Sequence, residues 1–161
     1  DFVFNPPKTE KVNQLDKYYS KKGKFKIQFP DKPKKSKEKI ETEIGKIKIY
    51  SFTYNIDNIE YNVSYNDFPE EYMQYSDDKK MIKGARDGFI KKLDMNISHE
   101  KWYKISNFEC VIFRANNGKH YASVKQVLAN NRLYQISILS SGKDVTDKKR
   151  EDFLNSFQLV K

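Results

Sequence analysis

Several kinds of residue are scarce in this 161-residue sequence, and each scarcity excludes something. The one cysteine, Cys110, cannot form a disulfide within the chain. No apolar run approaches the ~20 residues of a membrane-spanning helix. The P-loop, the dinucleotide-binding glycine motif and the G-x-S-x-G motif are all missing, so the sequence carries no common signature of nucleotide binding or serine hydrolysis.

Potential metal ligands are also few. The two histidines, His99 and His120, are isolated and lack the spacing of metal ligands. The acidic pairs at 70–71 and 77–78 lack the alternating oxygen ligands of a calcium-binding loop, and helix capping explains the second pair better. We therefore predict no metal site, no cofactor and no catalytic residues.

Cys110 lies in the apolar segment Phe108–Phe113. Its surroundings predict a small buried side chain, because a reactive thiolate needs exposure and an adjacent base. A cysteine-dependent hydrolase, in which the fold brings His99 or His120 beside the thiol, is the least favoured of the hypotheses.

Positive charge is abundant, and nearly all of it is lysine. There are 31 Lys and Arg residues against 22 Asp and Glu, which gives a net charge of +9 at pH 7. Such an excess attracts nucleic acid or an anionic membrane. However, arginine, whose planar fork suits phosphate, occupies only four positions, and residues 55–78 carry acidic side chains without any Lys or Arg. Nucleic-acid binding is therefore an alternative and not the leading prediction.

The densest basic segment spans residues 21–39. Within it, residues 32–39 are predicted to form a loop that contains Lys32, Lys34, Lys35 and Lys37. A solvated connection is the simpler interpretation of such a run. The functional alternative is a basic surface that binds nucleic acid or anionic lipid, and steep salt dependence would support it.

The segment from Lys119 to Ser140 is predicted to be the central antiparallel hairpin, because two apolar-rich runs flank Asn130-Asn131. A two-residue loop would pair Ala129 with Arg132. A three-residue loop would pair Ala129 with Leu133. A slip of one residue exchanges the two faces, and the second register is preferred because it groups the more apolar set of side chains.

Hydrophobic period predicts the remaining elements. Strands are predicted at 24–29, 40–44, 46–54, 60–66, 101–105, 108–113 and 157–160. A helix is predicted from about 77 to 93, capped by Ser76 or Asp77, and a shorter one up to about Asn155. Gly84 and Gly88 each cost ~1 kcal/mol relative to alanine inside the longer helix, so we expect them to form a smooth strip for close packing.

The presence or absence of strand and helix periodicity divides the chain into two regions. Residues 1–22 lack a strand or helix period and are predicted to be a tether, whereas residues 23–161 are predicted to form one domain. Because the sequence begins at Asp1, any signal peptide or lipid anchor is expected to lie upstream.

Aromatic residues suggest a binding surface. Trp102 and Tyr103 are predicted to line a ligand or partner site together with Tyr72 and Tyr75, which follow the Phe68-Pro69 break. The alternative is that these rings cap the core of the sheet.

Five segments carry a family resemblance: GKFKIQFPDKP at 23–33, IEYNVSYNDFP at 59–69, the helix end GFIKKL, the strand RLYQISIL, and FLNSFQL at 153–159. In hydrophobic pattern and element order, residues 23–161 resemble the PsbP-like superfamily. The resemblance implies an α+β fold, an α/β/α sandwich around a central antiparallel sheet. It implies no common reaction, and the metal-binding residues of photosystem members have no matching motif here.

The predicted function is non-enzymatic. The resemblance to bacterial members of the superfamily implies an extracytoplasmic domain at the cell envelope, either periplasmic or a surface lipoprotein. Such a domain would bind a protein or a small ligand, with a membrane contacted only through an upstream lipid anchor.

Overall fold

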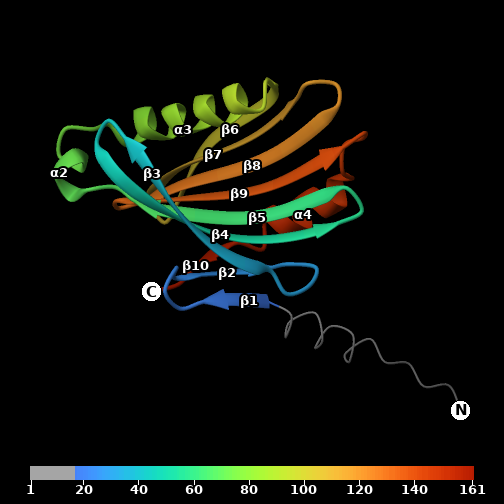
Figure 1. Cartoon of the computed structure of the whole chain (residues 1–161), viewed down its shortest axis with the longest axis horizontal. Coiled ribbons are helices and arrows are strands. Elements are labelled where there is room, and N and C mark those ends of the chain that lie inside the picture. Colours follow the sequence, from blue (N-terminus) through green and yellow to red (C-terminus); the bar gives the residue numbers. More distant parts are fainter. Residues whose placement is uncertain (1–16) are drawn as a thin grey trace, which may run out of the picture.

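The computed structural model describes residues 17–161. Its centre is a seven-stranded antiparallel sheet in the strand order β3-β4-β5-β9-β8-β7-β6 (Figure 1). The strands of this sheet are β3 (Lys34–Thr42), β4 (Gly45–Ile56), β5 (Ile59–Asp67), β6 (Asn96–Ile105), β7 (Phe108–Asn116), β8 (His120–Ala129) and β9 (Arg132–Ser141). A smaller sheet, in the order β1-β2-β10, contains β1 (Lys17–Ser20), β2 (Phe25–Gln28) and β10 (Gln158–Leu159).

Both faces of the large sheet are covered. Helix α3 (Asp78–Lys92) lies on one face, after a single turn, α2 (Glu70–Met73). The small sheet and helix α4 (Asp147–Leu154) lie on the other face. Each face has its own hydrophobic cluster, one built around Ile82 of α3 and the other around Phe25 of β2. The predicted α+β class with a central antiparallel sheet is confirmed.

The central hairpin forms, but in the register that was not preferred. Ala129 pairs with Arg132 across a two-residue loop in which Asn130 has a φ of 58°. The preference for a three-residue loop assumed that the polar residues of β8 would face water. In fact α4 covers them: Lys125 donates from Nζ to the Leu154 carbonyl oxygen at 3.2 Å, and the hydroxyl of Ser123 accepts from Arg150 Nε at 2.8 Å.

Two predicted boundaries are wrong. Residues 17–20, which were assigned to the tether, form β1 and pair with β2, so the folded domain includes residues before 23. Residues 1–16, the rest of the predicted tether, lie outside the described residues. The predicted basic loop at 32–39 is mostly strand, because β3 begins at Lys34 and pairs with β4 along its whole length.

Helix α3 agrees with its predicted position, but the role predicted for its glycines is wrong. The Asp77 carboxylate caps the helix by accepting from the Lys79 backbone N–H at 2.9 Å. Met81 and Phe89 are half-buried on the sheet, and Ile82 is fully buried. Gly84 and Gly88 are exposed, and a β-carbon at either position would meet no atom within 4 Å. They therefore do not serve close packing.

Within residues 17–161, no helix has the length and apolar character needed to cross a bilayer.

Candidate functional site

The turn formed by residues 21–24 joins the small sheet to the large one. Arg132 donates from Nη1 to the Lys22 carbonyl oxygen at 3.1 Å, and the Tyr134 hydroxyl donates to the Gly23 carbonyl oxygen at 2.5 Å. The Gly23 N–H donates to Ser20 Oγ at 2.9 Å. A β-carbon on Gly23 would lie 2.8 Å from the rings of Phe25 and Tyr65. The turn is therefore so close to these rings that only glycine fits at this position.

A stack of two rings and two cations lies beneath this turn. Tyr50 and Tyr65 are direct partners on β4 and β5, and their ring centroids are 5.0 Å apart with an interplanar angle of 20°. Lys22 Nζ is 4.5 Å from the Tyr50 centroid, and the Arg132 guanidinium carbon is 4.5 Å from the Tyr65 centroid. The order across the sheet, β4, β5 and then β9, places Arg132 on the side of Tyr65 opposite Tyr50. Each ring is thus stacked on the other and contacted by one cation.

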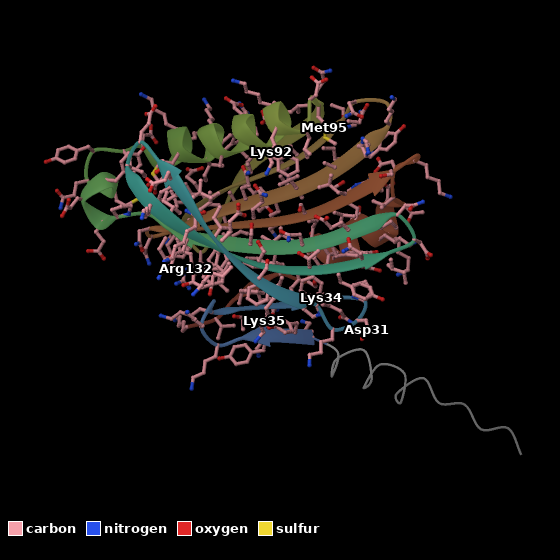
Figure 2. The ribbon with its side chains drawn as sticks, viewed as in Figure 1. Asp31, Lys34, Lys35, Lys92, Met95 and Arg132 are labelled. Atoms are coloured by element: carbon pink, nitrogen blue, oxygen red, sulfur yellow. The ribbon has the colours of Figure 1, made fainter. Side chains whose placement is uncertain are left out.

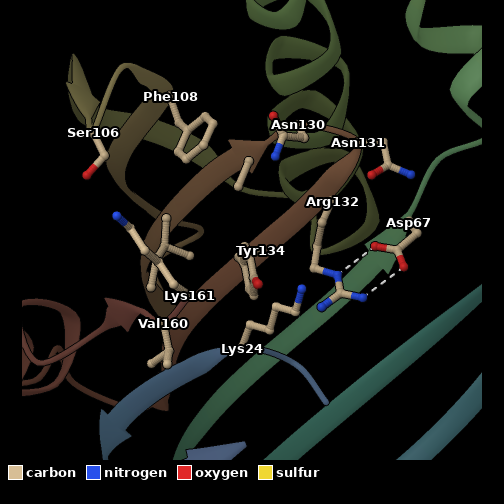
Figure 3. Close-up of a pocket in the computed structure, with 12 residues that line it drawn as sticks. Lys24, Asp67, Ser106, Phe108, Asn130, Asn131, Arg132, Tyr134, Val160 and Lys161 are labelled. Carbon is tan, nitrogen blue, oxygen red and sulfur yellow. Dashed lines mark hydrogen bonds and ion pairs between the residues drawn. The ribbon is translucent and has the colours of Figure 1, made fainter. Parts of the chain in front are cut away.

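Arg132 is fixed by a bidentate ion pair. Its Nε and Nη2 donate to the two carboxylate oxygens of Asp67 at 2.6 Å and 2.9 Å (Figure 3). The hydrogen bond with Asp67 raises the pKa of Arg132 despite partial burial, so the guanidinium charge is permanent. Burial raises the pKa of Tyr65, and the charge of Arg132 opposes that rise. Tyr65 therefore stays neutral at physiological pH.

A cleft of about 580 Å³ lies on one side of the turn, between β1 and the start of β3. We call it the Lys–Tyr cleft. Its aromatic walls include Tyr18, Tyr19, Tyr50 and Tyr65. Its cations are Lys21, Lys22, Lys35 and Lys37, and none of its lining residues is acidic. Among residues 17–161, no ion pair involves these four lysines.

The four lysines of the predicted basic patch do not all lie on one face of β3. Lys35 and Lys37 are two apart on β3, so they share a face and both line the Lys–Tyr cleft. Lys34 is next to Lys35 at the start of β3 (Figure 2), so its side chain points to the other face of the strand. Lys32 precedes the strand, and neither Lys32 nor Lys34 lines the cleft. The four lysines therefore do not form one surface.

Sequence reasoning placed Lys21 and Lys22 in the basic segment 21–39 but did not associate them with the rings of Tyr18 and Tyr19. Lys21, Lys22, Tyr18 and Tyr19 fell in the predicted tether because the stretch is too short to show a period. The signal that could have identified them is local: the pairs Tyr18-Tyr19 and Lys21-Lys22 immediately before Gly23 place two rings and two cations at one tight turn.

The predicted aromatic patch is not one surface. Tyr72 and Tyr75 are exposed around α2, and Tyr75 is 90% exposed. Trp102 packs in the α3-side cluster with Phe68, and Lys79 Nζ lies 5.3 Å from its ring centroid. Tyr103 lies in the opposite cluster, because consecutive residues of a strand point to opposite faces of the sheet. Trp102 and Tyr103 thus pack against the two cores, as the alternative interpretation held.

Cys110 is buried as predicted. Burial raises the pKa of its thiol, although the Tyr103 hydroxyl and the Lys125 charge oppose the rise. His99 pairs with Arg114, four residues or about 13 Å along β7 from the thiol. His120 lies at the other end of β8, seven residues or about 23 Å from the residue that pairs with Cys110. No imidazole is therefore placed to act as a base for this thiol.

Metal ligands do not converge in the part of the chain that the structure describes. Residues 17–161 contain no group of three or more His, Cys, Asp or Glu side chains able to hold a metal ion.

Comparisons with known proteins bear on the fold alone. Neither the protein-family models nor the curated proteins give a match to this sequence. One solved structure with a similar fold is a protein from Bacteroides thetaiotaomicron, with a TM-score of 0.50 and 14% sequence identity. The match covers 91% of this chain and 48% of that protein, so the chain spans about half the length of its structural neighbour.

Proposed function

We propose that this chain is a non-enzymatic binding domain that holds a polyanion in the Lys–Tyr cleft. The observation that carries the proposal is the charge of the cleft: four lysines from two separate segments line it, without an acidic residue among them. Like charges brought together in a concave site raise the local positive potential, and an anion that enters relieves their repulsion.

The chemistry of the cleft favours a sulfated, phosphorylated or carboxylated glycan over single-stranded nucleic acid. Sequence-tolerant binding of single strands depends on bases that stack on free aromatic faces. Here Tyr50 and Tyr65 stack on each other, and Lys22 and Arg132 each lie 4.5 Å from one of the two ring centroids, so both rings are already engaged within the protein. Tyr19 is the exposed ring of the cleft, and Lys26 Nζ lies 5.7 Å from its centroid. The cleft therefore offers more ammonium groups than open ring faces, which suits anionic groups on a polar backbone.

The finer architecture and the location belong to the same proposal. Helices on both sides of an antiparallel sheet, in this order along the chain, support a PsbP-like α/β/α sandwich. Members of that superfamily at the bacterial envelope support an extracytoplasmic domain. Fractionation of the source cells tests the location, and recovery of the protein with the cytoplasmic fraction would refute it.

The proposed ligand class can be tested by calorimetry with a heparin hexasaccharide at low and moderate salt. The double substitution Lys35→Gln with Lys37→Gln should weaken binding roughly thirtyfold, because each of the two lost ammonium groups contributes on the order of 1 kcal/mol. The matched control is Lys39→Gln with Lys48→Gln, which removes the same charge from the same hairpin outside the cleft. That control should change affinity much less.

Two results would refute the proposal. Equal loss in both double variants would mean that net charge, and not the cleft, binds heparin. Tighter binding of a thymidine oligonucleotide than of heparin, at matched charge and salt, would identify nucleic acid as the ligand instead.

A further inference from the structure

A second cleft, of about 450 Å³, adjoins the 21–24 turn at Lys24. Three segments that are distant in sequence meet there: the β6–β7 turn at Ser106, the β8–β9 loop at Asn130, and the residues that follow β10. Figure 3 shows Lys24 on one side of Tyr134 in this cleft and Lys161 on the other. We call it the Phe108 cleft. It shares no lining residue with the Lys–Tyr cleft.

The floor of the Phe108 cleft is apolar. Phe108, Ala129, Leu159 and Val160 line it, and each is only half-buried. Apolar side chains that stay in contact with water gain free energy when a ligand covers them, at about 25 cal/mol per Å². The volume also falls within the ~300–1,000 Å³ that is usual for small-molecule sites. The floor therefore suits the apolar body of a small ligand.

The charge around this floor is positive. Lys24 and Lys161 contribute ammonium groups, and no ion pair is found for Lys24 among residues 17–161. Asp67 is the one acidic residue among the lining residues, and both of its oxygens accept from Arg132. Among these side chains a ligand cation would find no open carboxylate, whereas a ligand anion would find the Lys24 ammonium group.

The walls are held in place before any ligand arrives. The Val160 N–H donates to the Lys24 carbonyl oxygen at 2.9 Å, and the Tyr134 hydroxyl holds Gly23. Lys24, Ser106 and Asn130 all have left-handed backbones, with φ of 56°, 49° and 58°. Such residues each cost on the order of 1 kcal/mol and persist only where their surroundings fix them. The site therefore loses little entropy on binding.

We propose that the Phe108 cleft binds an anionic amphiphile, a molecule with one carboxylate or sulfonate joined to an aliphatic or aromatic body. The body covers Phe108, Leu159 and Val160, and the anionic group pairs with the Lys24 ammonium. This proposal is independent of polyanion binding, because the two clefts share no lining residue.

The test uses the full chain and two probes, 8-anilinonaphthalene-1-sulfonate and decanoate. The sulfonate dye fluoresces when its rings leave water, and decanoate should displace it. Lys24→Asn removes the charge but keeps a residue that tolerates the left-handed backbone, so the turn should survive. It should weaken the binding of both probes about fivefold, the effect of losing one ion contact of about 1 kcal/mol. Val160→Asn should weaken both by a similar factor.

The control is the Lys39→Gln, Lys48→Gln variant, which removes two charges outside both clefts and should bind both probes as the wild type does. A cationic amphiphile, decyltrimethylammonium, should displace the dye much less well than decanoate. Equal displacement by the two amphiphiles, or unchanged binding in Lys24→Asn, would overturn the proposal.

Amide chemical shifts of the wild-type chain provide a second test that does not depend on the folding of a variant. Addition of decanoate to the wild-type chain should shift the backbone amides of Ser106, Asn130 and Lys161. Shifts confined to other parts of the chain would overturn the proposal as firmly as a negative mutant result.

Discussion

Arg132 Nη1 lies 3.1 Å from the carbonyl oxygen of Lys22, although the two residues are 110 positions apart in the sequence. This hydrogen bond attaches the turn of the small sheet to the first residue of β9. The same guanidinium covers Tyr65 and neutralises Asp67. One side chain therefore helps to fix a wall of each proposed cleft.

Replacement of Arg132 by lysine should destabilise the protein by about 2 kcal/mol, because a lysine cannot reproduce the paired hydrogen bonds to Asp67 and the bond to Lys22. Urea denaturation followed by circular dichroism measures this loss. Lys148→Gln is a useful comparison, since it breaks the exposed Lys148–Asp152 pair, and we expect no measurable shift of its midpoint. Similar midpoints for the two variants would contradict the structural role of Arg132.

Gly23→Ala should be destabilising by about 1–3 kcal/mol, the usual range for overpacking of a tightly packed site. The new methyl group would meet the rings of Phe25 and Tyr65 and the Ser20 hydroxyl, each at 2.8 Å. Gly84→Ala is the matched control: its methyl group meets no atom within 4 Å, and alanine favours the helix by ~1 kcal/mol. Opposite signs of the two changes in unfolding free energy are expected. A stable Gly23→Ala protein would mean that the turn does not sit against the rings.

Lys125 gives the protein a specific pH dependence. The side chain is 5% exposed, and burial lowers its pKa below the ordinary value of 10.5. Between the folded pKa and 10.5 the unfolded chain binds more protons, so this residue makes stability rise with pH across that interval. Below the pKa of Lys125 in the folded protein, the full free-energy cost of burying its charge lowers the stability.

Lys125→Met removes this contribution. The stability difference, variant minus wild type, should be most positive near neutral pH and should decrease as the pH approaches 10.5. Loss of the hydrogen bond to the Leu154 carbonyl adds a constant that does not depend on pH. Urea midpoints measured across this range provide the slope, and a difference that is flat with pH would show that Lys125 is not buried as a cation.

Cys110 should be inert in the folded protein, because burial both blocks access and raises the pKa of its thiol. Reaction with a disulfide reagent such as Ellman's compound should become fast only when guanidinium unfolds the chain. A rapid reaction under native conditions would reopen the hypothesis of a cysteine-dependent enzyme.

Much of the fold could be predicted because strand and helix periods are local. The alternation of Phe25, Ile27 and Phe29 predicts a strand with one buried face, and all three side chains are buried. The spacing of Met81, Ala85 and Phe89 predicts α3, and Asp77 supplies its cap. The hairpin register could not be predicted in this way. Lys125 and Ser123 belong to a buried face only because α4 supplies a carbonyl and an arginine as their partners.

The candidate site was predictable only in part. Lys35 and Lys37 were identified as basic residues, but the predicted loop gave them no common direction. Their shared face depends on pairing with β4, and the rings of Tyr50 and Tyr65 are brought to them by that pairing. The aromatic prediction failed at Tyr103 because a predicted strand was treated as a single surface, although its successive side chains alternate between two.

The sequence by itself determined the α+β class, the positions of the main elements and the burial of Cys110, because each depends on a period or a cap within a short segment. The tertiary structure alone decided which lysines lie together, which register the central hairpin adopts, and that two distinct clefts adjoin the 21–24 turn. Those features depend on contacts between segments up to 110 residues apart, such as Arg132 with Lys22, and no local pattern specifies them.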